Sequence, residues 1–203
     1  MQGHNGSDSI VTKLVGYFLT TLIIYFFLNN FSLSPDIDNI IRSAFISVII
    51  YTIWRFIFNK WLWRVTFIKV LAGVKKPYLH GRWEGYLKSS HDNFKTQVPI
   101  VIEIEQTYKS TCLTYYDERA LSRGLVTDFI TEEGASPRLF CIYRNEPAVA
   151  NQRELQMHYG TMILNVAGNA ESIAGVYYNY YLQRGTYGEL FVSLVNRKLK
   201  HGF

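Results

Sequence analysis

Several chemical signatures are missing from this 203-residue chain, and each absence removes a class of function. There are only two cysteines, Cys112 and Cys141, and no CxxC pair, which excludes a disulfide framework and indicates core thiols in a reducing compartment. No GxSxG, HExxH or Walker A motif occurs, and the five histidines lack metal-ligand spacing. We therefore expect a protein that is not an enzyme and that holds no metal ion and no cofactor.

Charged residues are missing from two long apolar runs near the N-terminus. The first, from Leu14 to Pro35, has 22 residues, and a helix of that length is ~33 Å long, enough for a hydrocarbon core of ~30 Å. The second runs from Ser43 to Trp54. These runs predict transmembrane helices over about 12–33 and 38–63. A cleaved signal peptide is the weaker interpretation, because the first run exceeds the usual ~7–15 residues and no small-x-small site follows it.

A basic excess is missing from the rest of the chain. Residues 1–77 hold 8 Lys/Arg and 3 Asp/Glu, a difference of +5, whereas residues 78–203 hold 13 of each. Binding to long DNA or RNA needs a basic face, so neither is an expected partner. Six basic residues follow the second run without an intervening acid, whereas the loop between the runs holds Asp36 and Asp38. The positive-inside rule then predicts a multi-pass membrane protein with both termini and residues 78–203 in the cytoplasm.

The sequence divides into two parts, 1–77 and 78–203. Residues 64–77 form a basic amphipathic stretch that we expect to extend the second helix as far as Pro77. The second part contains eight runs rich in Val, Ile, Tyr, Phe and Thr, separated by short polar or Gly-bearing segments: 81–88, 97–106, 110–117, 121–131, 138–144, 155–167, 172–183 and 186–195.

No helical pattern separates these runs, so the sheet is predicted to be antiparallel. Eight such strands in ~120 residues predict a closed up-and-down, lipocalin-like β-barrel with room for one small ligand, and a two-sheet sandwich is the alternative. Within 97–106, Val98 and the isoleucines at 100, 102 and 104 alternate with Glu103 and Glu105, which are predicted to be solvated.

Aromatic and amide side chains are the first candidates for a ligand site. Trp83, in GRWEGYL, is interpreted either as a plug at one end of the barrel or as a platform for a base. In GVYYNYY, alternation places Tyr177 and Asn179 on one face, and an inward Asn needs partners that a ligand or a neighbouring strand would supply. Tyr rings and hydroxyls suit nucleobases.

Arginines are the candidates for phosphate contacts. Arg144 and Arg153 flank the segment NEPAVANQ, which we expect to fold over a barrel mouth. A small anionic ligand needs only two or three such residues. The candidate ligand-binding set is therefore Trp83, Arg144, Arg153, Tyr177 and Asn179.

Taken together, the two apolar runs, the basic stretch, GRWEGYL, GVYYN and GTYGEL resemble the two-transmembrane, β-strand-rich effectors of CBASS antiphage defence, which accompany cGAS/DncV-like nucleotidyltransferases. The resemblance implies a cytoplasmic barrel that binds a cyclic dinucleotide made by a cognate nucleotidyltransferase. It also implies self-association on binding, contact with inner-membrane lipid, membrane disruption and cell death by abortive infection. The alternatives are a membrane-tethered lipocalin-like carrier or scaffold for an apolar ligand, and an enzyme built on a barrel.

Overall fold

The computed structural model describes residues 16–18, 20–22, 25, 37–130, 136–151, 156–180, 182 and 185–203. The chain separates into two compact units, Met1–Lys75 and Lys76–Phe203.

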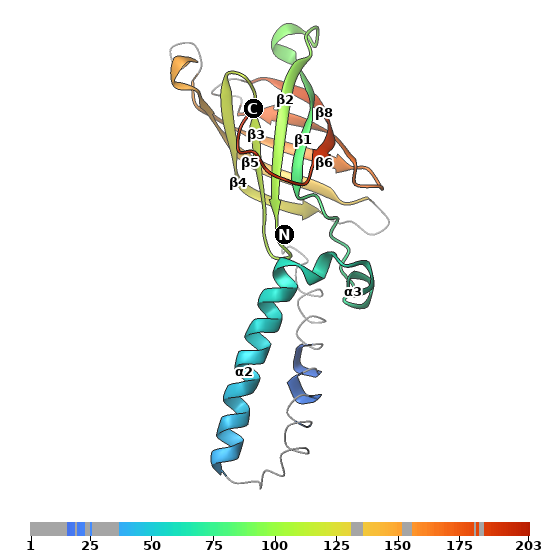
Figure 1. The fold of residues 1–203 in the computed structure, drawn as a ribbon. Helices are drawn as coiled ribbons and strands as arrows, with labels where there is room; N and C mark the ends of the chain where they lie inside the picture. The colour runs from blue at the N-terminus through green and yellow to red at the C-terminus, as the bar shows by residue number, and fades with distance from the viewer. Residues whose placement is uncertain are drawn as a thin grey trace. The chain divides into compact units, whose positions relative to one another are not determined.

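Helices make up the first unit (Figure 1). Helix α2 covers Ile37–Lys60, a single 3₁₀ turn covers Leu62–Arg64, and α3 covers Thr66–Leu71. Most of the predicted first span, 12–33, lies outside the described residues. Within the part of the chain that is described, no helix has both the length and the apolar character needed to cross a bilayer.

Helix α3 is shorter than the sequence predicts, and Pro77 is not what ends it. The residue after its C-cap, Gly73, has φ of +63°, a left-handed conformation that costs glycine little. The Val74 N–H donates to the Lys69 carbonyl over 2.9 Å, and the Gly73 N–H donates to that of Val70. This pattern is a Schellman cap, which terminates a helix four residues before the proline is reached.

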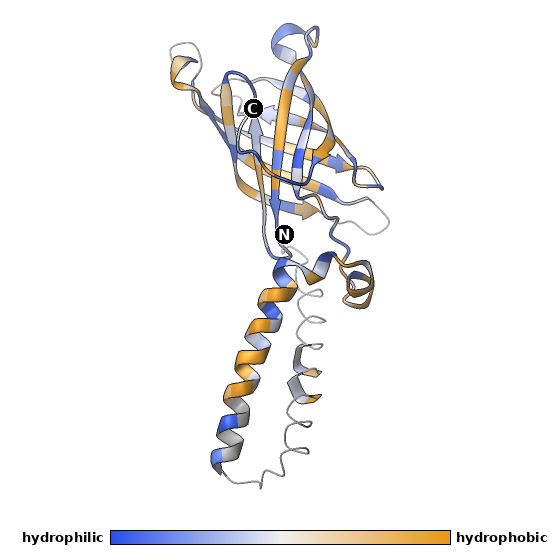
Figure 2. Ribbon diagram, viewed as in Figure 1, coloured by the Kyte–Doolittle hydropathy of each residue, from blue (hydrophilic) through white to orange (hydrophobic). Residues whose placement is uncertain are grey.

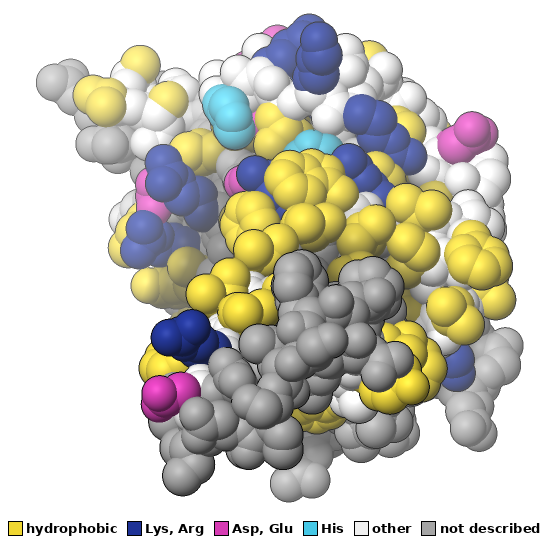
Figure 3. All heavy atoms as spheres, turned by 60° about the horizontal axis from the view of Figure 1, so that its bottom comes forward, with side chains coloured by type: hydrophobic (Ala, Val, Ile, Leu, Met, Phe, Trp, Pro, Cys, Tyr) yellow, Lys and Arg dark blue, Asp and Glu magenta, His cyan; other side chains and the backbone are white. Residues whose placement is uncertain are grey.

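Large apolar side chains are exposed on the helical unit. On α2, Phe45, Val48 and Phe56 are more than half exposed, and on α3 Phe67 and Val70 are over three-quarters exposed. Figure 2 shows the apolar character of α2 along its middle turns. Hydrophobic side chains also gather on the face of the molecule in Figure 3, with Lys and Arg side chains among them.

An eight-stranded antiparallel barrel makes up the second unit (Figure 1). Each strand pairs with the next in sequence and β1 pairs with β8, so the sheet is closed and the predicted barrel is confirmed over the alternative sandwich. The strands are β1 Gly81–Ser89, β2 Val98–Gln106, β3 Thr111–Tyr116, β4 Ala120–Ile130, β5 Arg138–Pro147, β6 His158–Val166, β7 Ser172–Asn179 and β8 Tyr187–Asn196.

Alternating side chains fill one half of the barrel interior. Ile100, Ile102 and Ile104 are buried as predicted, and they pack with inward residues of the other strands. Trp83 has no exposed surface, and its indole N–H donates to the Leu79 carbonyl over 2.9 Å. It therefore plugs the end at which the chain enters the barrel from residue 76 onward.

Glu103 is not solvated, and this corrects the prediction from alternation. The side chain points outward on β2 but is only 3% exposed, because residues 197–202 cross over it. Its carboxylate accepts from Arg82 Nη1 at 3.2 Å and from the backbone N–H groups of Lys200 at 2.7 Å and His201 at 3.0 Å. We call residues 197–202 the strap.

The two cysteines are not both core thiols as predicted. Cys141 is buried, and burial raises the pKa of its thiol to about 11. Cys112 is exposed, because Leu113 and Tyr115 take the inward positions of β3 and leave the intervening residues outside.

Candidate functional site: a polar cavity at the open end of the barrel

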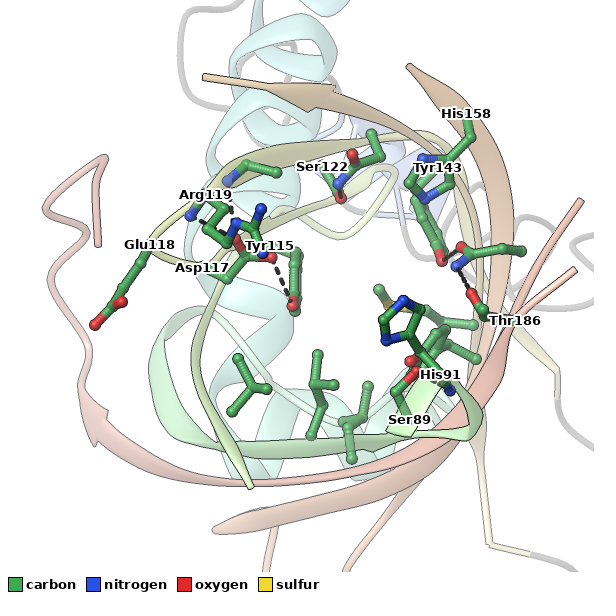
Figure 4. A pocket seen from close by; sticks show the side chains of 18 of the residues that line it. Ser89, His91, Tyr115, Asp117, Glu118, Arg119, Ser122, Tyr143, His158 and Thr186 are labelled. Carbon is green, nitrogen blue, oxygen red and sulfur yellow. Dashed lines mark hydrogen bonds between the residues drawn. The ribbon is translucent and has the colours of Figure 1, made fainter. Parts of the chain in front are cut away.

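The barrel encloses a cavity of about 350 Å³ at the end opposite the Trp83 plug. Its mouth is formed by the β1–β2 connection with His91, Asp92 and Thr96, by the β3–β4 turn 117–120, and by Thr186 before β8. Figure 4 looks into this opening. A cavity with one open end holds a ligand that enters end-on.

Aromatic and apolar side chains form the inner wall. Alternation along β3, β5 and β7 turns Tyr115, Tyr143 and Tyr177 inward, where each is less than a tenth exposed. Met162, Leu87 and Leu190 complete the wall. Such a lining offers rings for stacking and flexible thioether contact, which suits a flat heteroaromatic group.

A chain of hydrogen bonds crosses the wall from β5 to Thr186, the residue before β8. The Tyr143 hydroxyl donates to Asn179 Oδ1 over 2.7 Å, and Asn179 Nδ2 donates to Thr186 Oγ1 over 2.6 Å (Figure 4). Tyr143 reaches β7 by crossing Gly160 on β6, where an added Cβ would lie 2.3 Å from the phenol oxygen. Gly160 is thus the residue that permits the Tyr143–Asn179 contact.

A second polar group lies nearer the mouth. Asn145 on β5 is 6% exposed, and its Nδ2 donates to Oγ of the buried Ser122 over 2.8 Å. Asn145 is paired in register with His158 of β6, which is also buried and whose Nδ1 lies 3.1 Å from the Gln156 carbonyl oxygen. His158 is therefore a buried residue of the barrel wall with a hydrogen-bond partner.

The β3–β4 turn is organised by Asp117. Its Oδ1 accepts from the backbone N–H groups of Arg119 at 2.7 Å and Ala120 at 2.8 Å, and its Oδ2 accepts from the Tyr115 hydroxyl at 3.0 Å. Burial, reinforced by the Asp117 charge, raises the pKa of Tyr115 well above its usual value. The Tyr115 hydroxyl is therefore a neutral donor at physiological pH.

The β1–β2 connection holds strained backbone beside the cavity. Asn93 and Phe94 have φ of 56° and 61°, a region that bulky residues rarely adopt. The segment is fastened to β8, since the Tyr187 N–H donates to Ser90 Oγ and the Phe94 and Tyr187 rings lie 5.9 Å apart. This strain at consecutive residues is typical of a functional segment.

Asp92 lies in that same connection. The Thr96 N–H donates to its Oδ2 over 2.8 Å, and hydrogen bonding to Thr96 lowers the pKa of the carboxyl group. Its Oδ1 is shielded from solvent and has no hydrogen-bond partner in the described part of the chain. The carboxylate is thus held ionised at the mouth.

The charge at the mouth is mixed. Asp92, Asp117 and Glu118 are the acids among the lining residues, and Arg119 is the strong base. Glu118 points away from the opening in Figure 4. The negative charge of Asp117 is dispersed by the hydrogen bonds that its carboxylate accepts. Among the described residues, no three His, Cys, Asp or Glu side chains are grouped to hold a metal ion.

The structure distributes the five sequence candidates differently. Tyr177 and Asn179 line the cavity, on the face that alternation predicts. Trp83 is the plug rather than a platform. Arg144 lies on the outer face of β5, where it is paired with Glu146 through Nε at 2.8 Å and does not reach the cavity. Arg153 lies outside the described residues.

One inward residue of β5, Asn145, was missed by the sequence reasoning. Leu139, Cys141 and Tyr143 alternate as inward apolar residues of RLFCIYRNEP, and continuing the same alternation places Asn145 inside and Arg144 outside. That signal was present in the sequence. The Asn145–Ser122 bond was not predictable, because it depends on the register between β4 and β5.

Comparison with known proteins gives one family. The family described as "Cap15, cyclic dinucleotide receptor domain" matches residues 74–193, more than half of the chain and nearly the whole barrel. No curated protein matches. A receptor domain of this kind indicates a CBASS effector that binds a ligand rather than an enzyme. The chain therefore belongs to the Cap15 family, and its barrel is a cyclic dinucleotide receptor domain.

Proposed function

We propose that the protein is an antiphage effector whose barrel, on binding a cyclic dinucleotide from a cognate nucleotidyltransferase, drives self-association and disruption of the bacterial inner membrane. The observation that carries the proposal is a one-ended cavity with an aromatic wall and two inward amides, Asn145 and Asn179, in a chain of the Cap15 family. The cyclic dinucleotide acts as an activating ligand, and no cofactor takes part.

The dimensions of the cavity support partial entry of the ligand. A cyclic dinucleotide is at the large end of ligands held in cavities of ~300–1,000 Å³, and about 350 Å³ is at the small end. One nucleoside therefore occupies the barrel while the phosphates stay at the mouth. Arg119 is the described cation there, and Arg153 remains a sequence prediction for the same role.

The helical unit supports attachment to the inner-membrane lipid. Its sequence contains the charge-free run from Leu14 to Pro35, and α2 and α3 expose large apolar side chains next to Arg and Lys. In this proposal the two N-terminal segments span the bilayer, and the barrel and both termini are cytoplasmic. Two spans in one copy do not enclose a wide pore, so disruption requires many copies.

The alternative of an apolar-ligand carrier or scaffold is less well supported. A carrier for lipid needs a wall of aliphatic side chains, whereas this wall presents Asn145, Asn179 and His158. Burying such groups against hydrocarbon leaves hydrogen bonds unmade, at a cost of about 1–3 kcal/mol each.

Two measurements test the proposal. Calorimetry of the full chain in detergent with a panel of cyclic di- and trinucleotides should give micromolar or tighter binding of at least one cyclic dinucleotide, and light scattering should show larger particles with that ligand. Co-expression with a cyclic dinucleotide synthase should make cells permeable to an impermeant dye, whereas either protein alone should not. A full chain that binds none of the panel would refute the receptor role. Binding without permeability would refute the membrane role alone.

A further inference from the structure

Asn145 presents one unused hydrogen-bonding atom to the cavity. The side chain is 94% buried, and its Nδ2 is committed to Ser122 Oγ. Its Oδ1 has no hydrogen-bond partner within the described ranges, yet Asn145 is part of the cavity lining. An amide carbonyl left in this position is an acceptor held ready for a donor that arrives with a ligand.

The neighbouring amide differs in this respect. Asn179 uses both ends of its side chain, Oδ1 with Tyr143 and Nδ2 with Thr186. That chain of bonds fixes the shape of the wall. Of the two amides in the cavity wall, Asn145 alone has its acceptor available for recognition, although the sequence drew attention to Asn179.

We propose that Asn145 is the base-reading residue, an inference that rests on the proposed receptor function. Its Oδ1 accepts a hydrogen bond from a ring or exocyclic N–H of one nucleobase that enters the barrel. Ser122 positions the amide by accepting from Nδ2, which leaves Oδ1 as the unbonded end of a side chain that lines the cavity. The site therefore takes a nucleobase N–H edge inside and leaves the phosphates outside.

Ligand chemistry favours the base over the other groups. Phosphate and ring oxygens of the ligand are acceptors, so they repel a carbonyl oxygen, whereas every nucleobase found in these ligands carries N–H donors. The rings of Tyr115, Tyr143 and Tyr177 lie in the same cavity and offer stacking surfaces for the base. A ribose hydroxyl is the other possible donor, and the experiment separates it from the base.

The test is a coupling cycle with the full chain in detergent. Binding of the cyclic dinucleotide that wild type prefers is compared with binding of its N-methylated-base and 2′-deoxy analogues, for wild type and for Asn145→Leu, which has nearly the same shape. We expect Asn145→Leu to weaken binding of the parent ligand about ten- to hundredfold, as for a lost buried hydrogen bond. N-methylation of the base should weaken binding to wild type by a similar factor and binding to Asn145→Leu by little.

Two further variants keep the result interpretable. Ser122→Ala leaves Oδ1 in place but removes its positioning partner, so a few-fold loss of discrimination against the methylated base is expected even if Asn145→Leu does not fold. Asn169→Ala removes an exposed amide from the β6–β7 turn and should change nothing.

The possible outcomes separate the two hypotheses. Unchanged affinity of both cavity variants means that water alone satisfies Oδ1, and it overturns the inference. Coupling to the 2′-deoxy analogue instead of the methylated base overturns it as well. If wild type binds no cyclic dinucleotide, the receptor proposal fails, and this inference fails with it. If wild type binds but shows no coupling, only this inference fails.

Discussion

Replacing Glu103 by alanine should be among the most destabilising single substitutions in the barrel. Its carboxylate is 3% exposed and accepts hydrogen bonds from Arg82 and from two backbone N–H groups of the strap. The substitution removes the acceptor for all three donors. Arg82, which is itself 5% exposed, then keeps only Glu84 as an ionic partner, at 2.7 Å, together with the Gly202 carbonyl.

The magnitude follows from leaving one charge of a buried pair behind. Breaking such a pair typically costs about 3–5 kcal/mol. Burial lowers the pKa of Arg82, but its hydrogen bonds to Glu84 and Glu103 outweigh this effect and raise the pKa, so the guanidinium stays charged in the variant. Because Glu84 still compensates part of that charge, we expect a loss near the lower limit, about 3 kcal/mol. At a urea m-value of about 1.5 kcal/mol/M, the midpoint falls by about 2 M.

Urea denaturation of the full chain measures this change. Trp83 is the one tryptophan of residues 76–203, so its fluorescence reports barrel unfolding in a background where Trp54, Trp61 and Trp63 are phenylalanine. Glu105→Ala is the matched control, since Glu105 is exposed two residues along the same strand, and it should shift stability by less than about 0.5 kcal/mol. Replacing both partners, Arg82→Met with Glu103→Leu, should recover the part of the loss that comes from the uncompensated Arg82 charge, but not the part from the strap N–H groups of Lys200 and His201. Equal, small shifts for Glu103→Ala and Glu105→Ala would refute the buried-pair reasoning.

Two further predictions concern the interior. Gly160→Ala should destabilise the barrel by about 1–3 kcal/mol and weaken ligand binding, because its Cβ would occupy the path of the Tyr143 ring; denaturation and calorimetry check this, and an unaffected variant would contradict the crossing. A thiol reagent at pH 8 should label Cys112 quickly and Cys141 only on unfolding. Rapid labelling of Cys141 at pH 8 would contradict its burial. The folded-state pKa of Cys141 is raised to about 11. The stabilisation from its buried thiol is therefore present below pH ~9 and is lost as the pH rises toward 11.

The strands of the barrel were predictable because their signal is local. In β2 the isoleucines at every second position define the inward face, and in β7 the same alternation places Tyr177 and Asn179 inside. Eight runs without helices between them leave few topologies other than a closed antiparallel meander. The ends of most strands differ from the prediction by one to three residues. Such differences are expected, because the polar residues that flank a strand do not define the position at which it ends.

The errors have a different origin, which is contact between distant parts of the chain. Glu103 looked solvated because alternation places it outside, and nothing local shows that the strap, almost a hundred residues later, covers it. Arg144 was selected for its charge and its place beside a long loop, but its partner is Glu146, two residues away on the same outer face. Charge alone is therefore a poor guide to a site inside a barrel. The alternation of inward and outward side chains along each strand identifies both Asn179 and Asn145.

The two ends of the barrel have different physical roles, and this limits where ligand binding changes the protein. At the end with the Trp83 plug, the interior is filled and the strap fastens the entering chain, since Arg197 donates to the carbonyl oxygens of Tyr78 and His80. A packed, closed sheet of this kind deforms little. The other end has strained backbone at Asn93 and Phe94 and a partly filled cavity. A ligand shifts assembly only by binding one state better than another. The mouth is the part of the described barrel where two such states differ at small cost in packing. For the self-association that we propose, we therefore expect the recognition surface at the mouth rather than at the plugged end.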